Sequence, residues 1–164
     1  MRTVANVRRL NHAVLYVSDA TTSAKFYCDV LGFTFVQVAL GGRAVFLRAG
    51  ASKNHHDLGL FSVGAGRQNT KIGLYHLAWQ VDTIDDLAEV RSRLVAAKAL
   101  SGESDHGVSK SIYARDPDGI EFEVMWMVPE EHWGRYAVDA VVQPLDLKVE
   151  VDRWSGVATR VSGD

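Results

Sequence analysis

The hydrophobic and polar positions of the chain follow the same order twice. The stretches 10–17 (LNHAVLYV) and 74–81 (LYHLAWQV) are both typical of a short apolar strand with a histidine at its third position. Each is followed by apolar residues at helical spacing, over 26–31 in the first case and 87–97 in the second. The pattern therefore predicts a strand and then a helix at two places in the chain.

Residues that begin and end helices lie at the edges of these two helical stretches. Serine, threonine and aspartate side chains accept hydrogen bonds from the free N–H groups of a first helical turn. The candidates are Thr21, Thr22 and Ser23 for the first helix and Asp82 and Thr83 for the second. Asp85 and Asp86 add negative charge to the first turn of the second helix, where the helix dipole favours it. Gly32 is expected to end the first helix.

Strand patterns follow both predicted helices. They cover 33–40, 43–49 and 55–63 after the first helix, and 109–115 and 120–127 after the second. Gly41-Gly42 predicts a two-residue hairpin, and Asp116-Pro117-Asp118-Gly119 predicts a tight turn. A further strand is expected near 99–104, where the pattern is poorly defined. The order βαβββ is therefore predicted twice, which is an α+β organisation.

The two predicted units are interpreted as modules of one domain that spans residues 1–164. Module one covers about 8–63 and module two about 74–128, and the glycine-rich, polar stretch 64–73 links them. A C-terminal extension follows at 129–164, and its first residues, Pro-Glu-Glu, are typical of a helix start. The secondary structure of the last part stays open, since either a strand or a terminal helix fits the alternating residues Leu145, Leu147, Val149 and Val151.

Strand alternation places a few polar side chains on the faces opposite the apolar ones. His12, His76 and the acids Glu121 and Glu123 share this property, because side chains alternate between the two faces of a strand. On a solvent-exposed face they would be ordinary surface residues. If the sheet curls into a half-barrel, however, they converge inside it, and a buried charge needs a partner. Two imidazoles and one carboxylate suit a divalent metal and leave positions open, as in non-haem Fe(II) oxygenases.

Composition and charge exclude several other classes of protein. The 164 residues are 47% hydrophobic and 23% charged, as expected for a globular domain rather than a disordered chain. The net charge of -2 gives no reason to expect a nucleic-acid partner, and no apolar run is long enough to predict a membrane span. Cys28 is the only cysteine, which excludes a disulfide framework and a multi-cysteine zinc site. With no apolar signal segment near Met1, we expect a cytoplasmic protein.

Longer stretches of the sequence resemble a known family. LNHAVLYVSDATTSAKFYCDVLGF and YHLAWQVDTIDDL are similar to the module openings of the vicinal oxygen chelate superfamily. This superfamily includes glyoxalase I, fosfomycin- and bleomycin-resistance proteins and type I extradiol ring-cleaving dioxygenases. The resemblance covers roughly residues 8–130. HHDLGLF (55–61) and DHGVSKSIYARDPDGIEFEVMW (105–126) are most similar to catechol 2,3-dioxygenase-type sequences.

The resemblance implies a fold and a set of site residues. The two βαβββ modules would form one cupped mixed sheet around a metal site, with the helices outside. Carried over by position, the metal ligands are His12, His76 and Glu123. His56 would be an acid/base residue near the dioxygen site, and Tyr113 would hydrogen-bond a substrate oxygen. His106 resembles a further pocket histidine, at a shorter spacing from Tyr113 than in the large two-domain enzymes.

The function implied by the resemblance is extradiol ring cleavage of a catechol-like aromatic diol by O2. Fe(II) is the expected metal, with Mn, Ni or Zn as alternatives, and a homodimer is expected by analogy with relatives. A glyoxalase-like isomerase or lyase and a small-molecule-binding resistance protein are the alternative functions. The strand at 55–63 contains no glutamate, which disfavours glyoxalase chemistry, and a sequestering protein needs no metal triad. The better-known extradiol enzymes contain two such domains, whereas this chain contains one.

Overall fold

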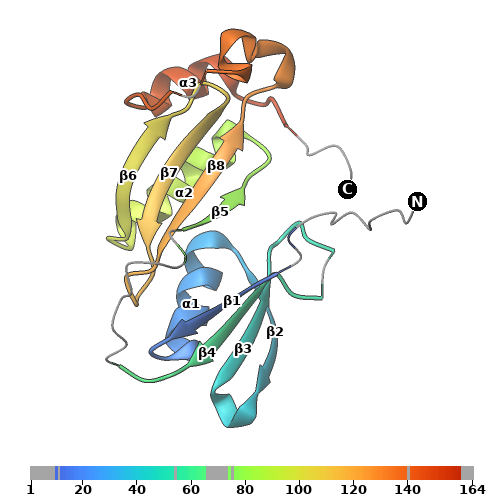
Figure 1. Cartoon of the computed structure of the whole chain (residues 1–164), viewed down its shortest axis with the longest axis vertical. Helices are drawn as coiled ribbons and strands as arrows, with labels where there is room; N and C mark the ends of the chain where they lie inside the picture. The colour runs from blue at the N-terminus through green and yellow to red at the C-terminus, as the bar shows by residue number, and fades with distance from the viewer. Residues whose placement is uncertain are drawn as a thin grey trace, which may run out of the picture. The chain divides into compact units, whose positions relative to one another are not determined.

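The computed structural model of the chain describes residues 10, 12–53, 55–65, 74, 76–139 and 141–159. Contacts between residues divide the chain into two compact units, 1–69 and 70–164. Each unit contains a strand, a helix and three more strands in chain order (Figure 1), which confirms the predicted α+β class and the two βαβββ modules. Most of the predicted linker, residues 66–73, lies outside the described residues.

The first unit is a four-stranded mixed sheet with one helix on its buried face. Its elements are β1 (Ala13–Val17), α1 (Ala20–Leu31), β2 (Thr34–Ala39), β3 (Ala44–Arg48) and β4 (Leu58–Ser62). The strand order is β1-β4-β3-β2, with β1 parallel to β4 and the other pairs antiparallel. Leu15 and Val17 are buried whereas Val14 and Tyr16 are about half exposed, which confirms the predicted alternation along β1.

The start of α1 differs from the prediction, and its end agrees with it. Asp19 is the N-cap, and its carboxylate accepts a hydrogen bond from the backbone N–H of Thr22 at 2.7 Å. The prediction of Thr21, Thr22 or Ser23 as the cap was therefore wrong, because the helix already begins at Ala20. Gly32 ends the helix with a φ of 71°, a left-handed conformation that glycine adopts without steric cost.

Two connections in the first unit are longer than the sequence pattern predicts. β2 and β3 form a hairpin, but its connection runs over Leu40–Arg43 rather than over the two glycines alone. β4 begins only at Leu58, so the prediction that a strand starts at residue 55 was wrong. The reason is Asp57, whose carboxylate accepts hydrogen bonds from Ala49 N–H and the Ser52 hydroxyl, both at 2.8 Å, and bends the chain there.

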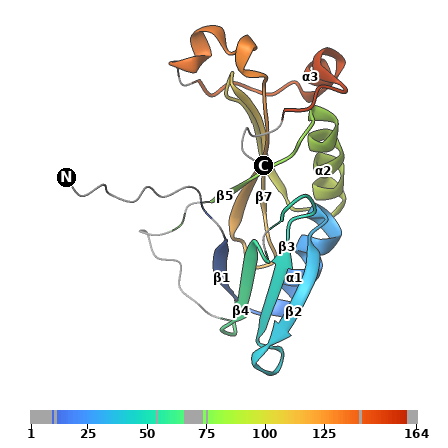
Figure 2. The ribbon, with the colours of Figure 1, turned by 90° about the vertical axis from the view of Figure 1, so that its right-hand side faces the viewer.

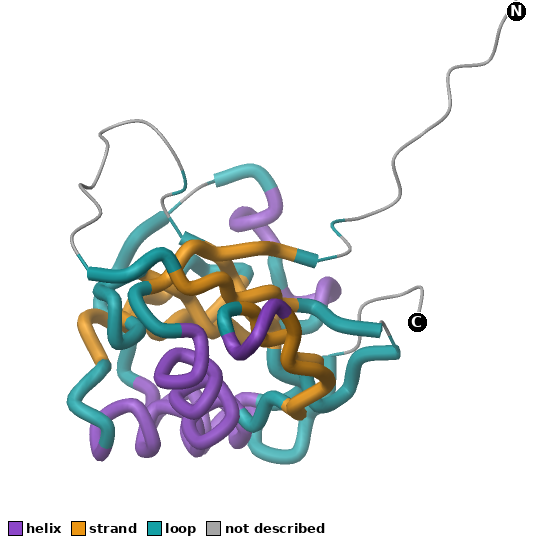
Figure 3. Tube along the Cα trace, turned by 90° about the horizontal axis from the view of Figure 1, so that it is seen from below, coloured by secondary structure: helices purple, strands orange, loops and turns teal. Residues whose placement is uncertain are grey.

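The second unit repeats the arrangement of the first. Its elements are β5 (Leu77–Gln80), α2 (Ile84–Ala96), β6 (Leu100–Asp105), β7 (Ser109–Arg115) and β8 (Glu121–Met127). The strand order is β5-β8-β7-β6, with β5 parallel to β8. Figure 2 shows α2 along one side of this sheet, and Figure 3 gives the helices and strands of the chain different colours. β6 is the strand expected near 99–104.

The core of the second unit lies between α2 and its sheet. Leu87, Val90 and Leu94 are buried, as the helical spacing predicts. Ala97 is exposed instead, because it is the C-cap residue and no longer lies on the apolar stripe of the helix. The facing side chains of β7 and β8 are fully or almost fully buried; they are Ile112, Phe122, Val124 and Trp126. Burying such a set of large apolar side chains is the main stabilising contribution to the module.

A capping box fixes the start of α2. The Thr83 hydroxyl accepts a hydrogen bond from Asp86 N–H at 3.0 Å, and the Asp86 carboxylate accepts one from Thr83 N–H at 3.1 Å. We expect Thr83→Ala to lower the free energy of unfolding by about 1 kcal/mol, because one N–H group of the first turn loses its acceptor. Denaturant titration measures this. Ser92→Ala on the exposed face of the same helix is the control, and equal effects of the two substitutions would contradict the capping role.

The C-terminal extension contains short 3-10 helices and one α-helix. Glu130–His132 and Gly134–Ala137 are 3-10 turns, and α3 spans Leu147–Trp154. The alternating residues from Leu145 to Val151, for which the sequence allowed a strand or a helix, are therefore mostly helical. α3 packs on α2. The Asp85 carboxylate accepts hydrogen bonds from the Ser155 hydroxyl and Gly156 N–H, at 2.9 and 2.7 Å. Across the described residues, none of the helices is long and apolar enough to span a membrane.

Candidate functional site

His76 and Glu123 lie side by side in the second unit. Glu123 is on β8 at the position paired with Ala78, and His76 directly precedes β5, so the parallel pairing of these strands brings the two together. His76 Nε2 is 3.2 Å from Glu123 Oε2. Glu123 is only 8% exposed, so its carboxylate is largely removed from water and depends on polar neighbours. The pair offers one imidazole nitrogen and one carboxylate oxygen, which are suitable donors for a divalent cation.

Glu121, the other acid on this strand, has a different partner. Arg115 Nη2 lies 3.0 Å from Glu121 Oε2, and the Arg115 side chain is more than half exposed. Glu121 is therefore occupied in an ion pair near the surface. This geometry supports Glu123 over Glu121 as the candidate ligand.

Tyr113 and His106 continue the row of polar side chains from His76. Tyr113 is on β7 at the position paired with Glu123, and its ring centre is 5.9 Å from that of His76. The Tyr113 hydroxyl lies 2.9 Å from His106 Nε2. His106 directly follows β6, and the next residue, Gly107, has a φ of 76° that turns the chain toward β7. Four of the six predicted site residues thus form one connected row in the second module.

The remaining two predicted residues, His12 and His56, are neighbours in the first unit. Their ring centres are 4.7 Å apart. Burial lowers the pKa of His56, and the nearby His12 and His55 rings lower it further, since each disfavours a second positive charge. His55 is also close to His56, with its Nδ1 3.0 Å from His56 Nδ1. The predicted acid/base histidine therefore lies directly beside the predicted first ligand.

An aromatic residue that sequence reasoning missed lies against His56. The Phe46 ring on β3 contacts the His56 ring edge-on, with centres 5.0 Å apart, and the Phe61 ring with centres 5.8 Å apart. Gly59 makes this packing close, because a Cβ at that position would lie 3.3 Å from a Val14 methyl carbon and 3.5 Å from the Phe46 ring. The signal was available, since Phe46 alternates with the buried Val45 and Leu47 along the strand.

The six predicted residues are thus distributed over two units. His12 and His56 belong to the first unit and His76, His106, Tyr113 and Glu123 to the second. Over the described ranges, no group of three or more His, Cys, Asp or Glu side chains gathers as a metal-binding cluster. The pair His76–Glu123 has the donor types that a metal ligand set requires. The three-residue ligand set of His12, His76 and Glu123 stays a prediction.

A groove of about 560 Å³ lies elsewhere in the second unit, along α2, β6 and the start of α3. Arg91 and Glu103 form a bidentate ion pair at its edge, with N–O distances of 2.8 and 2.9 Å. None of the six predicted site residues lines this groove. We therefore place the candidate chemistry at the His76–Glu123 row and not in the groove.

Comparison with known proteins finds relatives of similar sequence. The chain is 27% identical to the "Catechol-2,3-dioxygenase" of Bacillus subtilis, over 82% of this chain and 47% of that protein. It is 31% identical to "Biphenyl-2,3-diol 1,2-dioxygenase 3" of Rhodococcus globerulus, over 81% of this chain and 75% of that protein. It thus spans about half of the first relative and three quarters of the second.

Structural comparison and a family model extend this result. The crystal structure of lactoylglutathione lyase from Agrobacterium tumefaciens has a TM-score of 0.57 at 25% identity, over 74% of this chain and 96% of that one. Residues 9–124 match the model of the Glyoxalase/Bleomycin resistance protein/Dioxygenase superfamily. This match covers well over half of the chain and confirms the resemblance of the module openings. The chain belongs to the Glyoxalase/Bleomycin resistance protein/Dioxygenase superfamily.

Proposed function

We propose that the chain is a metal-dependent extradiol dioxygenase, which opens the ring of a catechol-like aromatic diol with O2. The observation that carries the proposal is the row Glu123–His76–Tyr113–His106 in the second module, with contacts of 3.2 Å at one end and 2.9 Å at the other. It combines a nitrogen–oxygen donor pair with two hydrogen-bonding groups for a substrate. The names of the Bacillus and Rhodococcus relatives, both dioxygenases of aromatic diols, support the same substrate class.

The proposed metal ligands are His12, His76 and Glu123, and Fe(II) is the proposed metal. Bound iron supplies the redox chemistry by which dioxygen is activated. The burial of Glu123 supports this assignment, because a buried carboxylate is stabilised by a cation. His76 Nε2, which lies 3.2 Å from that carboxylate, offers an imidazole nitrogen donor at the same place.

The other residues of the site would bind the substrate and handle its protons. His56, beside His12, would accept a proton from one diol hydroxyl and later return it, as an imidazole can near neutral pH. Tyr113 would hold a substrate oxygen through its phenolic group. Phe46 and Phe61 offer apolar rings on the same side of the first sheet as His56, which suits an aromatic substrate.

Anaerobic purification followed by metal analysis and oxygen-uptake assays tests this proposal. We expect roughly one iron per chain and an uptake of O2 that depends on added catechol or biphenyl-2,3-diol, since three protein ligands leave open positions for both reactants. The product is measured through the yellow absorbance of the opened ring. Iron-loaded protein that consumes no O2 with any vicinal diol would contradict the proposal.

A glyoxalase-like isomerase or lyase is the second candidate. The 25% identity to a structure called lactoylglutathione lyase favours it specifically. This activity needs no dioxygen, and it should therefore appear as anaerobic turnover of a thiol–aldehyde adduct with nickel or zinc bound. The two candidates are separated by one pair of assays on the same preparation, with and without O2.

A further inference from the structure

His106 connects the C-terminal extension to Tyr113. Its Nδ1 lies 3.0 Å from the backbone carbonyl oxygen of Val141, and its Nε2 lies 2.9 Å from the Tyr113 hydroxyl. A carbonyl oxygen can only accept a hydrogen bond, so Nδ1 must carry the hydrogen. In a neutral imidazole Nε2 is then an acceptor. It follows that the Tyr113 hydroxyl donates its hydrogen to His106.

Backbone pairing holds Val141 in place beside His106. Asp105 and Gln143 form an isolated antiparallel bridge, with N–O distances of 2.8 and 2.9 Å in the two directions. Asp105 immediately precedes His106, and Gln143 lies two residues after Val141. The extension therefore continues the edge of the sheet at β6, and this contact sets the position of the Val141 carbonyl.

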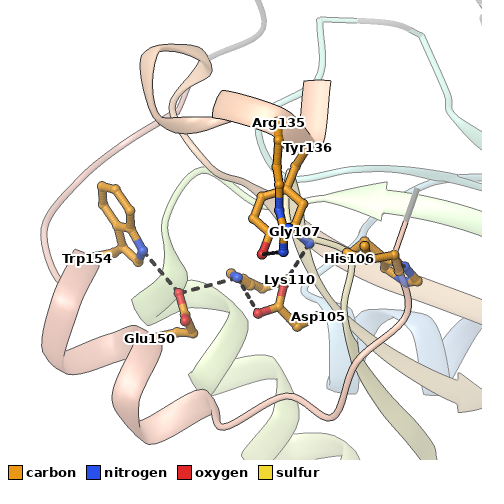
Figure 4. Close-up of polar contacts among 9 residues, drawn as sticks. Asp105, His106, Gly107, Lys110, Arg135, Tyr136, Glu150 and Trp154 are labelled. Atoms are coloured by element: carbon orange, nitrogen blue, oxygen red, sulfur yellow. Dashed lines mark hydrogen bonds and ion pairs between the residues drawn. The ribbon is translucent and has the colours of Figure 1, made fainter. Parts of the chain in front are cut away.

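A buried lysine forms ion pairs with the end of β6 and with α3. Lys110 is 5% exposed, and its Nζ lies 2.6 Å from Asp105 Oδ2 and 3.6 Å from Glu150 Oε2 (Figure 4). Glu150 also accepts a hydrogen bond from Trp154 Nε1 at 3.1 Å. Removing one member of a buried charge cluster leaves the others uncompensated. Lys110 thus links β7 to the end of β6 and to the C-terminal helix.

The turn after His106 packs against an aromatic ring of the C-terminal extension, Tyr136. Asp105 Oδ1 accepts a hydrogen bond from Gly107 N–H at 2.7 Å. A Cβ on Gly107 would lie 2.5 Å from the Tyr136 ring, so the ring packs directly on the backbone of this turn (Figure 4). The backbone on both sides of His106 is therefore held, at Asp105 by the Lys110 cluster and at Gly107 by Tyr136, while its ring contacts Val141.

We propose that the C-terminal segment 141–154 is a positioning element that holds neutral His106 as the Nδ1–H tautomer and directs the Tyr113 hydroxyl hydrogen to His106. Its consequence for catalysis rests on the proposed function. Tyr113 then presents the lone pairs of its oxygen to the substrate and accepts a hydrogen bond from a protonated hydroxyl of the diol. Val141, through its carbonyl, and Lys110, through Asp105, are the positioning residues. Neither is proposed to touch the substrate.

The imidazole ¹⁵N spectrum of the ¹⁵N-histidine-labelled chain tests the tautomer directly. At a pH where imidazoles are neutral, we expect the His106 signal to show a protonated Nδ1 and an unprotonated Nε2; the signal that is lost in His106→Gln identifies the residue. A parent protein with His106 as the Nε2–H tautomer would overturn the proposal. This spectrum requires no activity, so a failure of the dioxygenase assay overturns the proposed function and leaves the tautomer result standing.

Variants of the lysine cluster test the role of the C-terminal segment. We expect Lys110→Met to convert the single His106 tautomer into a mixture, because Asp105 and Glu150 lose their shared cation. Lys148→Met is the control, since Lys148 is an exposed lysine of α3 that pairs with Asp152 at 2.8 Å. Should Lys110→Met fail to fold, Glu150→Gln weakens the same link while keeping an oxygen acceptor for Trp154. A folded variant of either kind that retains the parent tautomer would overturn the role of the cluster.

Discussion

Replacing Glu123 with glutamine is expected to remove the metal and to abolish ring cleavage. The substitution keeps the size of the side chain but takes away the single negative charge of the proposed ligand set. Loss of a residue that only orients a ligand already weakens metal binding by about 10- to 100-fold, so the loss of a ligand should cost at least ~100-fold. Metal content after anaerobic loading and catechol-dependent O2 uptake are the measurements.

The chain offers a matched control for this experiment. Glu121 lies two residues earlier on β8 and pairs with the exposed Arg115. Glu121→Gln should therefore bind metal and consume O2 like the parent protein. Undiminished metal binding by Glu123→Gln, or equal losses in the two variants, would contradict the assignment of Glu123 as a ligand.

Replacing His56 with glutamine should separate metal binding from turnover. His56 lies next to His12 but is not one of the proposed ligands, so the metal content should stay at the parent level. Removal of a general acid/base typically lowers the rate by about 10²- to 10⁴-fold, and we expect kcat to fall within that range. Metal analysis and steady-state O2 uptake on the same sample give both quantities.

Two outcomes would revise the role of His56. Full turnover in His56→Gln would remove it from the mechanism, and joint loss of metal and turnover would make it a ligand instead. His132→Gln is the control, because His132 is exposed in the C-terminal extension and packs on Trp154. That variant should retain both metal and activity.

Periodicity predicted the strands and helices because each has one buried and one polar face. This is why the order of elements in both modules and the opposite placement of Leu15 and Val14 were predicted correctly. The errors occur where a side chain acts outside its own element. Asp19 caps the first helix from two residues before the first predicted cap, and Asp57 delays β4 by binding backbone and side-chain groups of the preceding loop. Such hydrogen bonds leave no periodic signal.

The sequence predicted only part of the candidate site, because some of its contacts also join different elements. Alternation identified the face of β8 that carries Glu123, and the resemblance selected it over Glu121. Lys110, by contrast, shares the face of β7 that carries the buried Ile112, where a lysine is not expected. Its partner Glu150 lies in α3, a segment whose secondary structure the sequence left open. The cluster becomes visible only when that helix is in place.

The parallel pairing of the first and last strands in each module has a consequence for the order of folding. Ala13 pairs with Leu58, and Leu77 pairs with Phe122. Each pairing closes a loop of about 45 residues, whereas the hairpins β2–β3 and β7–β8 close short ones at a smaller entropic cost. We therefore expect the hairpins to nucleate each module and the parallel strands to join late. Because the proposed ligands His12 and His76 directly precede those late strands, we expect the proposed metal site to form only when folding is nearly complete.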